Sequence, residues 1–180
     1  MKRRKILTAG LASGGLLIAG GTLGFYLNRV ADRSLLSLAV VKSELASLKG
    51  QNLQSSGQWA PSRVFIHCAK SIEFSMIGFP LHKSDGFKSA LGSNAFAVFA
   101  SLGKMTHSLD ETIPGEESLE LVGQKLSATD QAIDILLDRI DAFQNFQGKL
   151  KPHFAFGELT KADYELAHVM HIYNHLLEIS

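Results

Sequence analysis

Four separate stretches of this chain carry the apolar patterns or the end signals typical of amphipathic helices. In the first of them apolar residues recur at intervals of three and four positions. The first stretch covers residues 32–49 and ends at Gly50. Its apolar stripe consists of Leu35, Leu38, Val41, Leu45 and Leu48. The sequence therefore predicts a first helix over residues 32–49.

A second helix is bounded by strong local signals. Pro61 suits the first turn of a helix, and Gly78 and Pro80 follow the last apolar positions, so we expect the helix to end near Ile77. Its apolar face consists of Val64, Ile66, Ala69, Ile72, Phe74 and Met76.

Two further helices follow in the last third of the chain. The third is predicted to end near Phe146, before Gly148, and its stripe consists of Leu126, Ile133, Leu136, Leu137, Ile140 and Phe143. The last begins at Thr160 as N-cap, with Asp163 three residues later in place of the usual Glu of a capping box. We expect it to run almost to the C-terminus.

Between the second and third helices, residues 81–114 carry weak signals. Gly86, Gly92 and Gly103 punctuate this segment, and its apolar patch at residues 95–102 predicts one or two helical turns. Connections of this length in a compact domain are often functional. We therefore expect a long excursion that forms a lid or a pocket wall at one end of the helices.

Four amphipathic helices with one long connection, and no convincing strand or repeat, predict an all-α four-helix bundle. Such bundles hold ligands between side chains on facing helices. The 180 residues suffice for one domain of this kind. The formal charge of +1 argues against a nucleic-acid partner, and the single cysteine, Cys68, excludes an intrachain disulfide.

Ahead of the bundle, residues 6–27 contain no charged side chain, and residues 2–5 carry four positive charges. Such a stretch is long enough to cross a hydrocarbon core of about 30 Å, with the positive residues on the cytoplasmic side. We predict an N-terminal hydrophobic helix in residues 1–31, as a signal or membrane anchor, and the bundle in residues 32–180. This places the protein at the bacterial cytoplasmic membrane, with its body facing the periplasm or the cell exterior.

Two interpretations of the N-terminal segment stay open. Residues 3–7, Arg3-Arg4-Lys5-Ile6-Leu7, resemble a twin-arginine export signal, although Lys2 stands where Ser or Thr is usual. An ordinary transmembrane helix oriented by its positive charges explains the same residues. A suitable cleavage site with small residues does not follow the apolar stretch, so we expect the segment to be retained as an anchor.

The histidines are unevenly distributed. His168, His171 and His175 lie on the last predicted helix, and His67 lies on the second. His171 and His175 are about 40° apart around the helix and one turn apart along it, so both imidazoles can reach one metal ion. His67 could complete a three-histidine site that keeps positions open for water or substrate.

Several motifs resemble an uncharacterised branch, a domain of unknown function, of the DinB-like metalloenzyme superfamily. The resemblance covers roughly residues 32–180. The motifs are Gly57-Gln58-Trp59-Ala60-Pro61, His67-Cys68-Ala69-Lys70-Ser71-Ile72-Glu73-Phe74-Ser75-Met76, Gly78-Phe79-Pro80, His107-Ser108-Leu109-Asp110, Ile113-Pro114-Gly115, Pro152-His153-Phe154-Ala155-Phe156-Gly157 and Leu159-Thr160.

In that superfamily a bundle of four helices typically holds a divalent metal, with one histidine on the second helix and an H-x3-H pair on the last. The resemblance implies the ligands His67, His171 and His175. Asn174 takes the place of a histidine that relatives often carry, and Glu178 lies near the position of their glutamine, which affects the hydrogen bonds that orient the ligands. An imidazole site suits Zn, Ni or Fe.

The other candidate residues are assigned more ordinary roles. We expect His168 beside the site, as a pocket or supporting residue, and we can assign no partner to the loop residues His82, His107 and His153. Residues expected in the core are Trp59, Cys68, Phe143, Phe146, Phe154 and Phe156.

Three functions are compatible with these features. The first is a metal-dependent hydrolase or transferase; some DinB-like relatives transfer low-molecular-weight thiols, a chemistry less suited to the cell envelope. The second is a non-catalytic, membrane-anchored envelope bundle that binds a ligand or partner, and the third is a scaffold with vestigial histidines. Expected partners are an unidentified small-molecule substrate or ligand and the membrane through residues 6–27, and a homodimer is compatible with the sequence.

Overall fold

The computed structural model describes residues 33–114 and 126–180 of the chain. Every regular element in these two ranges is a helix. The β contacts there are isolated antiparallel bridges that pair Ser55 with Ile179 and His153 with Gly157. The described part is therefore all-α, which confirms the expected fold class.

The predicted signal or anchor, residues 1–31, lies outside the described residues, together with its apolar stretch at residues 6–27 and its twin-arginine-like motif. Within ranges 33–114 and 126–180, no helix is long and apolar enough to cross a membrane. Membrane attachment thus stays a prediction from the sequence.

The first predicted helix is divided near its start. A short 3-10 helix, η1 (Arg33–Leu35), precedes α2 (Leu38–Leu48). The helix begins again because the Ser37 side-chain oxygen accepts a hydrogen bond from the Val40 N–H, as an N-cap does. The apolar stripe of α2 is buried at Leu38, Val41 and Leu45.

Helix α3 (Pro61–Ile77) has the bounds that its proline and glycine signals predict. Gly78 follows it with φ +114°, a backbone conformation that favours glycine, and the Gly78 N–H donates a hydrogen bond to the Phe74 carbonyl. The sequence signals at both ends of α3 therefore act as expected.

The last two long helices are α6 (Leu126–Asn145) and α7 (Lys161–Leu176). The Thr160 hydroxyl oxygen accepts a hydrogen bond from the Asp163 N–H, and the Asp163 carboxylate accepts one from the Thr160 N–H, both at 3.1 Å. The predicted capping box is thus present at the start of α7.

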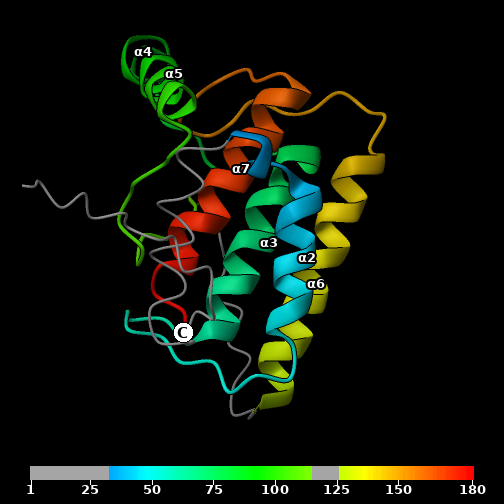
Figure 1. Ribbon diagram of the computed structural model, residues 1–180. Helices are drawn as coiled ribbons and strands as arrows, with labels where there is room; N and C mark the ends of the chain where they lie inside the picture. Colours follow the sequence, from blue (N-terminus) through cyan, green and yellow to red (C-terminus); the bar gives the residue numbers. More distant parts are fainter. Residues whose placement is uncertain (1–32, 115–125) are drawn as a thin grey trace, which may run out of the picture.

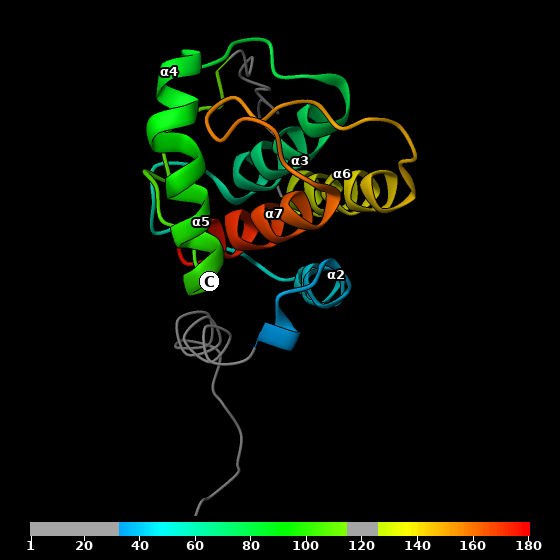
Figure 2. The ribbon, with the colours of Figure 1, turned by 90° about the horizontal axis from the view of Figure 1, so that it is seen from above.

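Helices α2, α3, α6 and α7 lie side by side in Figure 1, and Figure 2 shows them from above. Helix α3 packs extensively on α6, and both α2 and α7 contact this pair. Helices α3 and α6 run in one direction while α2 and α7 run in the other (Figure 1). Because α3 and α6 are parallel neighbours, the chain needs a long connection to return from Ile77 to Leu126.

That connection contains a second helical unit that lies across the long helices (Figures 1 and 2). It consists of α4 (Asp85–Phe87), the π-helical turn η2 (Lys88–Gly92) and α5 (Ser93–Leu102), which follow one another without a break. The predicted one or two turns are therefore too short. We call this unit, residues 85–102, the crosswise helix.

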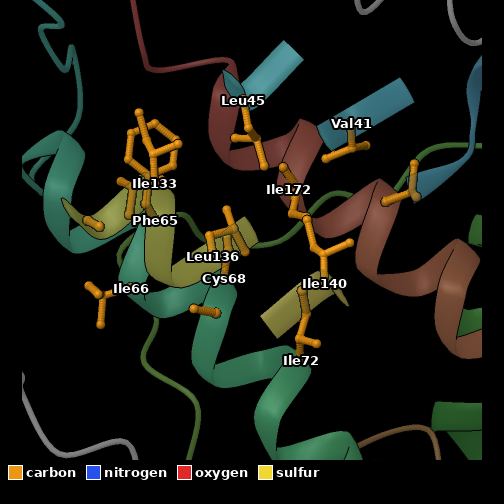
Figure 3. Packing of buried hydrophobic residues seen from close by; sticks show 14 of the residues in the cluster. Val41, Leu45, Phe65, Ile66, Cys68, Ile72, Ile133, Leu136, Ile140 and Ile172 are labelled. Carbon is orange, nitrogen blue, oxygen red and sulfur yellow. The ribbon is translucent and has the colours of Figure 1, made fainter. Parts of the chain in front are cut away.

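The apolar core lies between the long helices (Figure 3). Helix α6 contributes Ile133, Leu136 and Ile140, and α3 contributes Phe65, Cys68 and Ile72. Burial of each large apolar side chain stabilises a fold by about 1.5–3 kcal/mol. Trp59, Cys68 and Phe143 belong to this core, and Phe146 packs against it, as the sequence predicts.

Candidate metal centre

Three buried histidines from two helices meet between α3 and α7. His67 comes from α3, and His171 and His175 come from successive turns of α7. Each offers one ring nitrogen, and these nitrogen atoms all lie within 4.8 Å of one another. The structure therefore brings together the three residues that the sequence singles out.

The distances between the rings suit a shared ligand. His67 Nε2 and His171 Nε2 are 3.2 Å apart. The centroid of the His175 ring lies 4.8 Å from the centroids of both other rings. Two nitrogen atoms bound to one tetrahedral ion at about 2.0–2.1 Å are roughly 3.3–3.4 Å apart, which is close to the separation of the two Nε2 atoms.

Burial keeps the imidazoles of His171 and His175 neutral. His67 is 1% exposed, His171 9% and His175 0%. Burial, followed by the nearby imidazoles, holds the pKa of His171 well below its usual range and lowers the pKa of His175 to about 2. Because a metal ion binds the neutral ring, His171 and His175 are in the binding form at neutral pH.

Buried nitrogen atoms without hydrogen-bond partners gather at this site. Among the described residues, they include both ring nitrogens of His175 and Nε2 of His107. Leaving such an atom unsatisfied costs about 1–3 kcal/mol. A divalent cation would satisfy the lone pair of a neutral His175, and a set of neutral imidazoles suits Zn, Ni or Fe. The residues present therefore fit a metal ion.

Trp59 packs against the rings of His67 and His175. Its indole meets the His67 ring edge-on at 4.9 Å and lies parallel to the His175 ring at 6.0 Å. The Arg63 guanidinium covers the indole at 4.5 Å. Trp59 thus has the packing role predicted for it, and it also limits the rotation of the His67 and His175 rings.

His168 lies one turn before His171 and is buried. Its Nε2 is 3.3 Å from the Ser75 hydroxyl, which donates its own hydrogen to the Ile72 carbonyl. The Nε2–H of His168 must therefore be the donor to Ser75. His168 is not one of the three converging residues, which agrees with the supporting role expected from the sequence.

A cavity of about 300 Å³ opens beside the histidines. His67, His107, His168 and His171 border it, and polar atoms also come from Lys83, Ser71, Thr106, Thr112 and Glu111. Its large apolar lining residues are Phe87, Phe99, Met105, Ile113, Phe154 and Phe156. The long connection thus forms a pocket wall, and a cavity of this kind suits a small, largely apolar ligand.

His107, to which the sequence assigns no partner, lies beside two of the three converging histidines. Its ring centroid lies 5.1 Å from those of His171 and His175, and its Nδ1 is 2.7 Å from the Ser108 carbonyl oxygen. Helical periodicity could not reveal this position, because His107 lies in irregular chain after α5. The available signal is that His107 begins one of the motifs that carry the family resemblance.

His153, to which the sequence also assigns no partner, has several in the structure. Its Nδ1 accepts hydrogen bonds from the backbone N–H groups of Ala155 and Phe156, at 3.2 Å and 3.1 Å, and its ring stacks on the Phe156 ring. Burial, followed by the proximity of His168 and His82, lowers the pKa of His153 to about 3. His153 therefore organises a tight turn that borders the cavity.

Several other predicted roles need correction or detail. Phe154 and Phe156 line the cavity, so their role differs from the core packing of Phe143. His82 is exposed, and its ring lies 6.3 Å from that of Phe79. The carboxylate of Glu178 lies beside Gly57, in a small surface pocket.

Gly92 allows the crosswise helix to approach the turn that His153 organises. A Cβ atom at Gly92 would overlap the backbone carbonyl of Ala155. Since backbone atoms cannot move aside as a flexible side chain can, the helix and the turn can touch only where this side chain is absent. The contact holds together two segments that line the cavity.

Comparisons with known proteins agree with a single domain over most of the chain. No curated protein and no solved structure matches the chain significantly. A family model described as "Protein of unknown function (DUF1569)" matches residues 30–180, which include the three converging histidines, His107 and every helix described above. The chain therefore belongs to the DUF1569 family.

Proposed function

We propose that this protein binds one divalent metal ion through His67, His171 and His175, in the manner of the DinB-like four-helix bundles that it resembles. The observation that carries the proposal is the convergence of three buried imidazoles within 4.8 Å. The origin of the ligands supports it, because the superfamily pattern takes one histidine from the second helix of the bundle and two from the last.

The site suits a reaction with a small molecule. Three protein ligands leave positions on a metal ion for water or substrate, and a bound ion can activate water or a thiol, or polarise a substrate. The adjoining cavity, with its largely apolar lining, would hold and desolvate that molecule. Hydrolysis and group transfer are the reaction classes that fit this arrangement, with Zn, Ni or Fe as the metal.

A non-catalytic role in binding a ligand or partner is the second candidate. It is favoured by the position of Glu178, the residue that stands near the glutamine of the family pattern. The Glu178 carboxylate lies beside Gly57. Outer hydrogen bonds tune the affinity and reactivity of a metal site. A bundle that has lost such a group could bind metal without turnover.

Membrane attachment completes the proposal. The uncharged stretch of residues 6–27 supports an anchor that holds the bundle at the outer face of the bacterial cytoplasmic membrane. Fusing residues 1–29 to a folded reporter tests the export route. Export that fails in a strain without twin-arginine transport would support that pathway, and unchanged export would favour an ordinary transmembrane helix.

Metal content tests the site directly. Purify the full-length chain in detergent as wild type, as His171→Ala and as His82→Ala, which removes an exposed histidine. We expect about one Zn, Ni or Fe ion per chain in wild type and His82→Ala, and clearly less in His171→Ala, because this change removes one of the ligands that hold the ion. Helical circular dichroism should show that all three variants are folded.

Equal trace metal in all three proteins after incubation with each cation would overturn the proposal. If the metal binds, relaxation of water protons by a bound paramagnetic ion tests for an exchangeable position on it. Turnover of a panel of small esters and thiols by the wild type, lost in His171→Ala, would support the enzyme. A metal without exchangeable water or turnover would support the binding protein.

A further inference from the structure

We propose that His107 supplies a fourth imidazole to the metal ion, through its Nε2 atom. The inference rests on the proposed metal site and extends it to the long connection between α3 and α6. An ion that takes more than four ligands, such as Ni or Fe, would still keep a position for water or substrate. It assigns a specific role to a histidine that lies outside every helix.

The first support is the position of the His107 ring. Its centroid lies 5.1 Å from those of His171 and His175, and the three converging rings lie 4.8–5.0 Å from one another. Imidazoles on one tetrahedral ion, with bonds of about 2.1 Å, have centroids roughly 5.2 Å apart. His107 is thus at a ligand's distance from two of the three proposed ligands.

The second support is the state of its two nitrogen atoms. Nδ1 lies 2.7 Å from the Ser108 carbonyl oxygen, which can only accept, so Nδ1 carries the hydrogen. Nε2 of the neutral ring then has a lone pair, and this atom is buried without a hydrogen-bond partner. An Nδ1–H bonded to a backbone carbonyl, with Nε2 left free, is the arrangement that fixes many metal-binding histidines.

The third support is the anchoring of the short segment that carries His107. Asp110 accepts a hydrogen bond from Gln58 Nε2 at 2.6 Å and another from the Ser108 hydroxyl. Gln58 directly precedes Trp59, which packs against the rings of His67 and His175. The segment that holds His107 is therefore tied to the same loop that supports two of the proposed ligands.

A small movement must accompany binding. His107 is not in the set of nitrogen atoms that lie within 4.8 Å of one another, so its ring must approach the other three to share the ion. His107 borders the cavity, as do its neighbours Met105 and Thr106. Metal binding would thus draw this part of the cavity wall toward α7, and the number of ligands would be coupled to the shape of the pocket.

The experiment counts ligating nitrogens. Load the full-length chain, with nitrogen-labelled histidine, with a spin-active cadmium isotope, and detect scalar coupling between cadmium and each imidazole. We expect four coupled Nε2 or Nδ1 atoms in wild type and His82→Asn, and three in His107→Asn. Asparagine is the matched substitution, because its amide nitrogen can replace Nδ1–H at the Ser108 carbonyl while nothing replaces Nε2.

Metal affinity gives a second measurement. Competition with a chelator should show that His107→Asn binds Zn²⁺ more weakly by at least about 100-fold. Loss of a residue that only supports a ligand weakens metal binding by up to about 100-fold, and loss of a ligand should weaken it at least as much. His107→Gln should recover part of this loss, since its amide oxygen can reach the position of Nε2. Three coupled imidazoles in wild type, with equal affinity in His107→Asn, would overturn the role of His107 and leave the three-histidine site intact. An absence of coupling to any histidine would instead contradict the proposed function itself.

Discussion

Helix α3 has two buried sides that differ in chemistry. On one side, Phe65, Cys68 and Ile72 belong to the apolar core with α6. On the other, His67 and Ser71 border the cavity near α7. The core side packs through apolar side chains, whereas the histidine side joins a cluster that includes buried nitrogen atoms without partners. Burial therefore stabilises the fold on one side and prepares a binding site on the other.

The largest expected effect tests the core side. Phe65→Ala should lower the free energy of unfolding by about 3–5 kcal/mol, because it removes a fully buried ring and leaves a cavity. The metal content per folded chain should not change. Urea denaturation followed by circular dichroism, combined with metal analysis of the folded fraction, measures both quantities.

The substitution His175→Leu tests the histidine side in the same way. It should strongly weaken metal binding, yet leave the unfolding free energy of the metal-free protein unchanged or raised, because an apolar group replaces two buried nitrogens without partners. If His175→Leu destabilises the metal-free protein as strongly as Phe65→Ala, the distinction between the two sides of α3 is wrong.

An intermediate effect should come from acid. Burial lowers the pKa of both His168 and His153 to about 3, so the unfolded chain, with pKa values near 6.5, binds protons where the folded chain does not. Stability due to this difference is complete above pH 6.5 and is lost as the pH falls toward 3. When the pH falls from 7 to 5, the unfolding free energy should therefore decrease by about 2 kcal/mol for each of the two histidines.

The comparison with His168→Phe isolates this contribution. Burial raises the pKa of Glu44 to about 8, which makes stability fall as the pH rises and so opposes the histidines. Both proteins contain Glu44, and Ser75 keeps its bond to the Ile72 carbonyl in the variant. The metal-free variant should therefore show a shallower loss of stability below pH 6.5. Identical pH profiles would show that His168 is not held neutral by burial.

The smallest expected effect concerns the N-terminus of α7. Thr160→Ala removes one half of the capping box and should lower the unfolding free energy by about 1 kcal/mol. The metal affinity should stay within a few-fold of wild type, since His171 and His175 lie in the second half of the helix. A large loss of affinity would mean that the site depends on the whole length of α7.

The helices that the sequence predicted best have strong local signals at their ends. Pro61 and Gly78 delimit α3, and Thr160 with Asp163 begins α7. The crosswise helix was underestimated because its apolar residues do not form one buried stripe: Leu91, Val98 and Leu102 are exposed. Its position depends on contacts with distant parts of the chain, which a periodicity does not contain.

The residues of the candidate site also differ in how well the sequence predicts them. His67, His171 and His175 were predictable because regular helices fix the direction of each side chain. His107 and His153 lie in irregular segments, where hydrogen bonds such as those of Gln58 to Asp110, and of the Ala155 N–H to His153, determine the direction of the ring. Such bonds depend on the folded path of the chain, so neither partner could be read from spacing.

Gly92 shows how a residue outside the cavity can govern what enters it. It contributes no atom to the lining, yet the absence of its side chain allows the crosswise helix to rest directly on the carbonyl of Ala155. Any larger residue would act as a spacer between these two backbones. Selectivity for ligand size could therefore change during evolution, or in the laboratory, without altering a single side chain that a bound molecule touches.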